Sequence, residues 1–339
     1  MATELHRMIR SQPGVLEQLA EIDVAAAAAT LGRASRVVIV GTGTSFHAAE
    51  LGAYLFRTGG VDAMAVPAIE AARWYPQPPA DAAYVIISHT GSTAYALALR
   101  TAVQCAGRPL VTITGQAAGW AEAIKTPTQE TSETYTVSYT AALAVLGLLA
   151  HHAANTPTGP AELLRAASAT REAVEQPGTT EITVPRRAMA IMGAGPWAIT
   201  ATEGALKIRE SAHLLAEGFD PERLLHGAAV PYDNQDVLIG LQPDADPDGL
   251  TGQLLDAARD EGIRTYVLAD HHTDLHPYLR QLAAVARLQL LASQLTVTQG
   301  TNPDTVIAGA WARDALWATG APRQQTDQEA GSTLDGTGL

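Results

Sequence analysis

Three charged residues in the second half of the chain have the types and spacing for acid–base chemistry. Glu203, Lys207 and Glu210 stand at positions i, i+4 and i+7, which places them on one face of a helix. The surrounding segment 202–219 is largely apolar or small, and we expect the charges near the beginning of a helix that follows Gly193. A carboxylate removed from water there has a raised pKa and can act as a base, while a lysine beside it can hold an oxyanion or phosphate. The alternative is an exposed ladder of ion pairs, which stabilises a helix by only a few tenths of a kcal/mol.

Histidines are the next candidates for chemistry. His226 lies in a segment expected to be a loop, where a lone histidine is more often structural or solvated than catalytic. His271, His272 and His276 are close enough in sequence to suggest a metal site, but they have neither a helical spacing nor an accompanying carboxylate pattern. We therefore expect these three histidines to lie in a solvated loop and to bind no metal.

Two loops rich in glycine and hydroxyl residues could bind a phosphate group. Residues 41–45 read Gly-Thr-Gly-Thr-Ser, and residues 88–93 read Ser-His-Thr-Gly-Ser-Thr. In such loops glycine lets the backbone approach a ligand, hydroxyls donate hydrogen bonds, and the N-terminus of the next helix favours an anion. Neither loop is a Walker A loop, and Phe46 replaces the third glycine of a dinucleotide fingerprint. Their residues could instead only cap helices, but two such loops at successive strand ends favour phosphate binding.

These candidates belong to a repeated alternation of short apolar strand, small-residue loop and helix. This alternation predicts an α/β fold with doubly wound parallel sheets, in two similar halves. A helix is expected over 15–32, and another begins at about residue 200. Residues 153–185, with one helix, read as the junction between the halves. Strands are predicted at 36–40, 84–87 and 110–113 in the first half, and at 188–192, 237–240 and 265–268 in the second.

Composition narrows the class of protein further. The 339 residues are 47% hydrophobic and 17% charged, and the net charge of −13 argues against a nucleic acid or an anionic membrane as partner. Cys105 is the single cysteine, so an internal disulfide and a cysteine metal cluster are excluded, and we expect it to be buried. Residues 1–14 lack the apolar core of a signal peptide, and the Ala-rich runs are interrupted by polar residues. We expect a soluble, cytoplasmic protein.

The loops and the glutamate helix together carry a resemblance to a known family. The chain resembles tandem SIS (sugar isomerase) domain proteins, and is most similar among them to the isomerase half of glucosamine-6-phosphate synthase. The resemblance implies two doubly wound, flavodoxin-like SIS domains in tandem. We place an N-terminal helical segment at 1–35, the two domains at 36–165 and 185–318, and a disordered tail at 319–339. The segments that carry the resemblance include 43–48, 87–93, 203–210, 216–217, 225–227, 266–270 and 288–292.

The resemblance also implies roles for individual residues. Glu210 matches the family's base, which moves a proton between C1 and C2 of the sugar, with Lys207 and Glu203 beside it. His226 matches a histidine that assists ring opening and reaches in from the second subunit of a homodimer. This chemistry requires no metal and no other cofactor. The residues that would line the sugar-phosphate pocket are Thr44, Ser45, Ser88, Thr90, Thr93 and His89, the last replacing the family's usual glutamine.

The chain departs from the synthase in three places. We expect no glutaminase domain with its catalytic cysteine, Trp311 stands where the synthase tail has a lysine, and residues 135–138 replace a Ser-Thr-Lys segment. We therefore expect an enzyme that isomerises an aldose and a ketose phosphate, or that deaminates or deglycates a ketosamine 6-phosphate. The alternatives are synthase-like amination with ammonia supplied by another protein, and a sugar-phosphate sensor without catalysis. The acidic charge and the lack of a helix-turn-helix segment weigh against the sensor.

Overall fold

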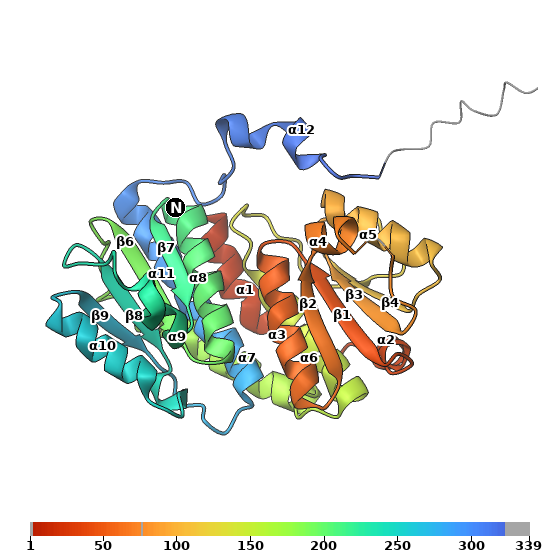
Figure 1. Cartoon of the computed structure of the whole chain (residues 1–339), viewed down its shortest axis with the longest axis horizontal. Coiled ribbons are helices and arrows are strands. Elements are labelled where there is room, and N and C mark those ends of the chain that lie inside the picture. Colours follow the sequence, from red (N-terminus) through yellow and green to blue (C-terminus); the bar gives the residue numbers. More distant parts are fainter. Residues whose placement is uncertain (1–2, 76, 323–339) are drawn as a thin grey trace, which may run out of the picture.

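The chain forms two parallel β-sheets that are separated by helices (Figure 1). The computed structural model describes residues 3–75 and 77–322. The first sheet has the strand order β2-β1-β3-β4-β5 and the second has the order β7-β6-β8-β9, so the second repeats the order of the first four strands. The predicted α/β class with parallel sheets is therefore confirmed. The strands are β1 Arg36–Gly41, β2 Asp62–Pro67, β3 Ala82–Ile87, β4 Leu110–Thr114, β5 Ile124–Lys125, β6 Ala188–Gly193, β7 Leu215–Phe219, β8 Val237–Leu241 and β9 Arg264–Leu268.

The six strands predicted from the sequence are all present, whereas β2, β5 and β7 were not predicted. Every residue of β3 and β8 is buried, as expected for strands with helices on both faces. In contrast, β2 and β7 are edge strands whose exposure varies along the strand, and this weakens the apolar signal. Gly218 in β7 is required by packing, because a Cβ there would lie 2.3 Å from the Cα of Thr202 in the neighbouring helix.

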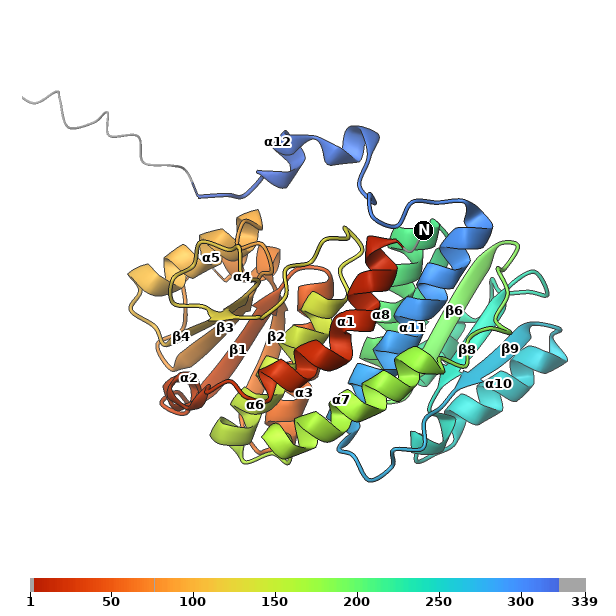
Figure 2. The ribbon, with the colours of Figure 1, turned by 180° about the vertical axis from the view of Figure 1, so that it is seen from behind.

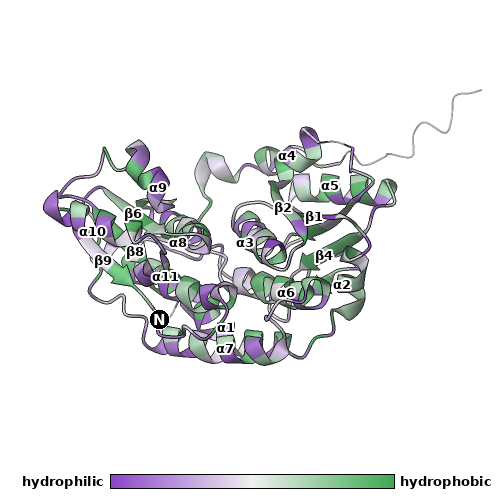
Figure 3. Cartoon of the chain, turned by 60° about the horizontal axis from the view of Figure 1, so that its bottom comes forward, coloured by the Kyte–Doolittle hydropathy of each residue, from purple (hydrophilic) through white to green (hydrophobic). Residues whose placement is uncertain are grey.

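Helices of both halves fill the space between the two sheets (Figures 1 and 2). Among them α3 of the first half packs on α8 of the second, while α1 and α7 run across both halves. Figure 3 shows that the strands are mainly hydrophobic and that the helices combine hydrophobic and hydrophilic residues. The central helices are α1 Glu4–Leu19, α3 Thr44–Thr58, α6 Val137–Ala154, α7 Pro160–Glu175, α8 Pro196–Ala212 and α11 Pro277–Gln299; the others are α2 Ala25–Leu31, α4 Ala68–Arg73, α5 Ala94–Cys105, α9 Pro221–Arg223, α10 Leu250–Asp260 and α12 Asp314–Trp317.

Helix α6 is the one helix in the described part of the chain that is long and apolar enough to cross a membrane by length and composition. In this fold 72% of its residues are buried inside the protein. It packs against α1, α2 and α3 as a core helix. Its apolar character is therefore accounted for by the protein interior.

The structure corrects three expectations. The helix predicted over 15–32 is two helices, α1 and α2, and α1 already begins at Glu4 with Pro13 inside it. Cys105 is exposed, because the buried residues of α5 follow a helical stripe that ends at Val103. Glu210 lies in the last turn of α8 rather than near its beginning, since this helix starts directly after the glycine loop. The predicted disordered tail falls mainly on residues 323–339, which lie outside the described residues.

Candidate active site

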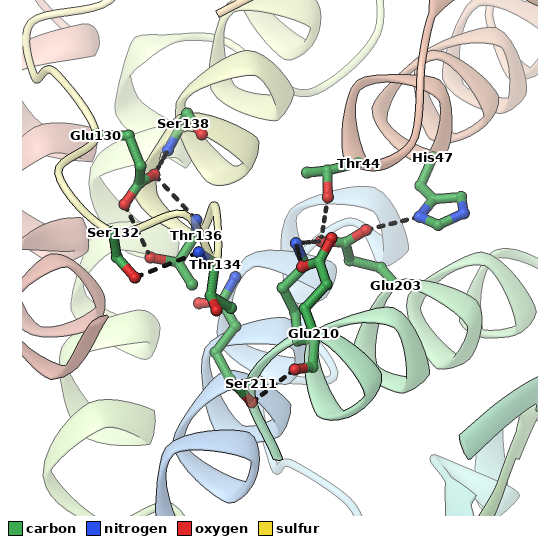
Figure 4. A network of polar contacts seen from close by, with 12 residues as sticks. Thr44, His47, Glu130, Ser132, Thr134, Thr136, Ser138, Glu203, Glu210 and Ser211 are labelled. Carbon is green, nitrogen blue, oxygen red and sulfur yellow. Dashed lines mark hydrogen bonds and ion pairs between the residues drawn. The ribbon is translucent and has the colours of Figure 1, made fainter. Parts of the chain in front are cut away.

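The charged face of α8 lies between the two halves of the molecule (Figure 4). The side chains of Glu203 and Lys207 are fully buried, and that of Glu210 is 25% exposed. The Lys207 Nζ atom lies 2.5 Å from Glu210 Oε2 and 3.6 Å from Glu203 Oε1. The alternative of an exposed ion-pair ladder is therefore wrong. One lysine is enclosed between two carboxylates, of which only Glu210 reaches solvent.

Glu203 connects this face to the first half of the chain. Thr44 Oγ1 donates a hydrogen bond to Glu203 Oε1 at 3.2 Å, and His47 Nδ1 lies 2.6 Å from Glu203 Oε2 (Figure 4). Thr44 and His47 are one turn apart at the start of α3, the helix that follows the first glycine loop. We had not selected His47 from the sequence. The available signal was its position three residues after Thr44, on the same face of a helix.

Burial and charge act together on the ionisation of these groups. Burial raises the pKa of Glu210 above its usual value, and the nearby Lys207 only partly opposes this effect. Burial acts to lower the pKa of Lys207, but the charges of Glu203 and Glu210 outweigh it, so the pKa of this lysine is raised. Lys207 therefore stays protonated. Glu210 is a carboxylate that accepts a proton more readily than an exposed glutamate does, which suits a general base.

The charge of a third carboxylate, Glu130, also acts on Lys207, and this residue was not predicted. It lies in the segment before α6, is 8% exposed, and accepts backbone hydrogen bonds from Thr136 at 2.9 Å and Ser138 at 3.0 Å (Figure 4). Burial raises the pKa of Glu130, and Lys207 and the hydrogen bonds oppose this effect. Its surroundings in the sequence are polar and indicate only a loop. Glu130 can act on Lys207 only because α8 packs near this segment in the folded protein, and no local sequence pattern indicates that packing.

The first glycine loop borders a cavity at the ends of β1 and β2. Gly43 has a φ of +54°, a conformation that favours glycine. Thr44 and Ser45 begin α3 directly after it and are half-buried. The cavity has a volume of about 270 Å³ and is lined by Gly41, Thr42, Gly43, Phe46, Pro67, Ala68, Ile69 and Tyr95.

The second hydroxyl loop follows β3. Ser88 is buried and donates a hydrogen bond to Thr93 at 3.2 Å, whereas Thr90 is exposed and accepts hydrogen bonds from Ser92. His89 has other partners. Its Nε2 accepts a hydrogen bond from the Glu130 backbone at 3.1 Å, and burial lowers its pKa to about 4. The His89 ring is therefore neutral near pH 7 and holds the segment that carries Glu130, so it offers no positive charge to a phosphate.

The described structure does not bring His226 to Glu210 within one chain. His226 is exposed, in an irregular turn over Leu224–Ala228. The strand before it, β7, runs back along α8 and contacts Thr202 through Gly218. Thr202 is eight residues before Glu210, or about 12 Å along the helix axis. The chain then continues from β7 into α9 and the turn that carries His226 (Figure 1).

The remaining histidines show no metal site. Within the described residues, no group of three or more His, Cys, Asp or Glu side chains is placed to hold a metal ion. His272 Nε2 lies 3.3 Å from Glu172, and His276 accepts a hydrogen bond from the backbone of Tyr278 at the start of α11. His271 is exposed. These contacts stabilise the loop that leads into α11.

The second half contains a glycine loop of the same shape but different chemistry. Gly195 has φ +58° and ψ −126°, and Gly43 has φ +54° and ψ −127°. Pro196 follows Gly195 and has no N–H group, and the loop carries no hydroxyl residue. The donors suited to a phosphate are therefore those of the first loop.

Comparison with known proteins finds a family similarity in the first half of the chain. Residues 30–152 match the SIS domain family. The matched segment includes the first sheet and both hydroxyl loops.

The similarity extends beyond that domain. The chain is 27% identical over 304 residues to glutamine–fructose-6-phosphate aminotransferase (isomerizing) of Pyrococcus horikoshii, covering 79% of this chain and 50% of that protein. It therefore spans about half the length of the curated relatives that it matches.

Three solved structures share the fold at 18–20% sequence identity. The C-terminal domain of glucosamine-fructose-6-phosphate aminotransferase from Francisella tularensis has a TM-score of 0.77 and 18% identity, covering 90% of this chain and 98% of that chain. Tagatose-6-phosphate ketose/aldose isomerase from Escherichia coli has a TM-score of 0.77 and 20% identity, with 91% and 98% covered. Glucosamine-6-phosphate deaminase from Thermotoga maritima has a TM-score of 0.74 and 18% identity, with 89% and 97% covered.

Proposed function

We propose that this protein is a cytoplasmic enzyme that binds a sugar 6-phosphate and moves a proton between its C1 and C2 atoms. The reaction is either the isomerisation of an aldose and a ketose or the deamination or deglycation of a ketosamine 6-phosphate. The SIS domain and the phosphosugar enzymes named above support this class of substrate. The repeated strand order supports a second SIS domain at 185–318 after the first at 36–165.

The observation that carries the proposal is the state of Glu210. Its carboxylate is mostly buried, has a raised pKa, and is held by a protonated lysine at 2.5 Å, yet a quarter of the side chain remains open to solvent. A solvated surface glutamate would have neither the burial nor the raised pKa. A carboxylate in this state can remove a proton from carbon and return it to the neighbouring carbon, which leaves the charge of the site unchanged.

The two hydroxyl loops would hold the phosphate. Ser45 and Thr93 stand at the starts of α3 and α5, where backbone N–H groups also face an anion. Ser88 and Thr90 complete the proposed pocket, and His89 supports it from behind by holding residues 129–130. The sugar would then extend from the phosphate towards Glu210.

A homodimer would complete the site. His226 is exposed, and β7, the strand before it, contacts α8 at Thr202, about 12 Å from Glu210 along the helix axis. We propose that it enters the site of a second copy, where it protonates the ring oxygen as the sugar opens. The exposed side chains of Leu225 and Val230 beside it, 53% and 84% exposed, would be covered in the same contact.

The proposal is tested by ¹H NMR in heavy water with glucosamine 6-phosphate, fructose 6-phosphate and 6-phosphorylated ketosamines. Wild-type protein should introduce deuterium at C1 or C2 of at least one of them. Glu210→Gln should reduce this exchange by about 10²- to 10⁴-fold while the protein stays folded. Glu217→Gln, at a glutamate on β7, is the matched control and should exchange at the wild-type rate.

Each other result has a definite meaning. Equal exchange by wild type and Glu210→Gln would refute Glu210 as the base. Binding of a sugar phosphate without any exchange would favour the sensor. Conversion of fructose 6-phosphate only when ammonium is added would favour amination with ammonia supplied from outside the chain.

A further inference from the structure

Glu203 is the point at which the two halves of the site are joined. It is fully buried, and its two oxygens have different partners. The Glu203 Oε2 atom lies 2.6 Å from His47 Nδ1 (Figure 4). The Oε1 atom accepts a hydrogen bond from Thr44 Oγ1 at 3.2 Å and lies 3.6 Å from Lys207 Nζ. Two of these three partners come from α3. Helix α3, which follows the first glycine loop, therefore positions the Glu203 carboxylate, and both Glu203 and Glu210 lie next to Lys207.

We infer that His47 is a positioning residue of the active site, which holds Glu203 so that Lys207 stays with Glu210. The inference rests on the proposed function in assigning Glu210 as the base. It adds a residue that touches neither the base nor the loop hydroxyls expected to bind phosphate. Thr44 and His47 of α3 contact Glu203, Glu203 lies next to Lys207, and Lys207 contacts Glu210. The helix that starts at the glycine loop is therefore connected to the base by a continuous series of contacts.

The distances show how the lysine is shared. Lys207 is much closer to Glu210, at 2.5 Å, than to Glu203, at 3.6 Å. Glu203 does not need a close contact with Lys207, because His47 forms a short, charge-assisted hydrogen bond with Oε2 of Glu203. Lys207 can therefore remain close to Glu210. Without His47, a fully buried carboxylate oxygen would lack a donor, which is costly. Lys207 is the cation within reach, and its movement towards Glu203 would weaken its hold on Glu210.

Other titratable groups around the base have also to be considered. On α8 these are Lys207 and Glu203, and His47 faces the site from α3. Tyr135 and Glu130 approach from the segment before α6. Neither Tyr135 nor Glu130 contacts Glu203 by a hydrogen bond in the described structure. Replacing His47 therefore acts on Glu210 through Glu203 and Lys207, in addition to the direct effect of the His47 charge.

Direct titration of Glu210 tests the inference without any substrate. Protein labelled with ¹³C at glutamate side chains is titrated by NMR, and the Glu210 carboxyl signal is assigned by its loss in Glu210→Gln. In His47→Ala the midpoint should rise by roughly one pH unit, since Lys207 stabilises the ionised base less well. His47→Asn should restore most of the wild-type midpoint, because its amide nitrogen can take the place of Nδ1. His152→Ala, which removes an exposed histidine at the end of α6, should leave the midpoint unchanged.

An unchanged Glu210 midpoint in folded His47→Ala would overturn the inference, as would an equal shift in His47→Ala and His47→Asn. If His47→Ala does not fold, the wild-type protein still decides. A ¹⁵N spectrum of its histidines should show a proton on Nδ1 of His47, because a carboxylate accepts that proton. A proton on Nε2 instead would refute the role. These readouts are independent of turnover, so a protein without isomerase activity could still confirm or refute the role of His47.

Discussion

Replacing Lys207 by methionine would remove the cation that lies between Glu203 and Glu210. Methionine fills a similar volume, so the change is mainly one of charge. Removing one partner of a buried ion pair typically costs about 3–5 kcal/mol. Lys207 is fully buried and has two carboxylate neighbours, at 2.5 Å and 3.6 Å. We therefore expect a loss of about 4 kcal/mol in the free energy of unfolding at neutral or higher pH.

The loss should depend on pH in a definite direction. Burial already raises the pKa of Glu210 above its unfolded value, and removal of the lysine should raise it further. A group with a raised folded pKa contributes stability at low pH and loses it as the pH rises through the folded pKa. The deficit of Lys207→Met relative to wild type should thus be large at about pH 8 and smaller at about pH 5.

Urea unfolding at both pH values measures this deficit. The matched control is Arg171→Met, which breaks an exposed pair with Glu17 at 2.7 Å, both side chains being 45% exposed. An exposed pair contributes less than about 1 kcal/mol, with little change between the two pH values. A deficit for Lys207→Met as small as that of the control, or the same at both pH values, would refute the reasoning.

Three further outcomes are expected. If Glu210 is the base, the rate of deuterium incorporation into substrate should fall as the pH is lowered, with a midpoint above pH 4.5, the usual pKa of glutamate. A midpoint at or below pH 4.5 would contradict the raised pKa of Glu210. Asp304→Ala should lower the free energy of unfolding by about 1–2 kcal/mol, because the Asp304 carboxylate accepts the N–H groups of Glu4 and Leu5 at 2.9 and 2.8 Å. Amide hydrogen exchange at the start of α1 should become faster, and unchanged exchange there would argue against this cap. Gly43→Ala should cost about 1–3 kcal/mol in urea unfolding through backbone strain alone, since nothing lies within 4 Å of the added Cβ, and a neutral effect would show that the loop relaxes.

Five of the six strands that could be predicted, all except β9, are buried along nearly their whole length. Val237–Leu241 is buried along its whole length, and such a run stands out in any sequence. Leu215–Phe219 lies at a sheet edge and includes Glu217 and Gly218, so it was missed. Helix α1 begins at Glu4, where Thr3 caps it locally by accepting the N–H group of His6, and Asp304, 300 residues away, accepts the N–H groups of Glu4 and Leu5. No window of local sequence contains the second partner.

By itself the sequence determined which groups are available for chemistry. The helical repeat alone places Glu203, Lys207 and Glu210 on one face, and the order of strand and loop places hydroxyl residues where parallel sheets bind ligands. The tertiary structure decided what these groups can do. It buries the lysine between two carboxylates, brings His47 to Glu203 across 156 residues of sequence, and places His226 on the surface in an irregular turn. Spacing along one helix is a local property, whereas burial and partners depend on how separate helices pack, and it is burial that gives the Glu210 carboxylate a raised pKa.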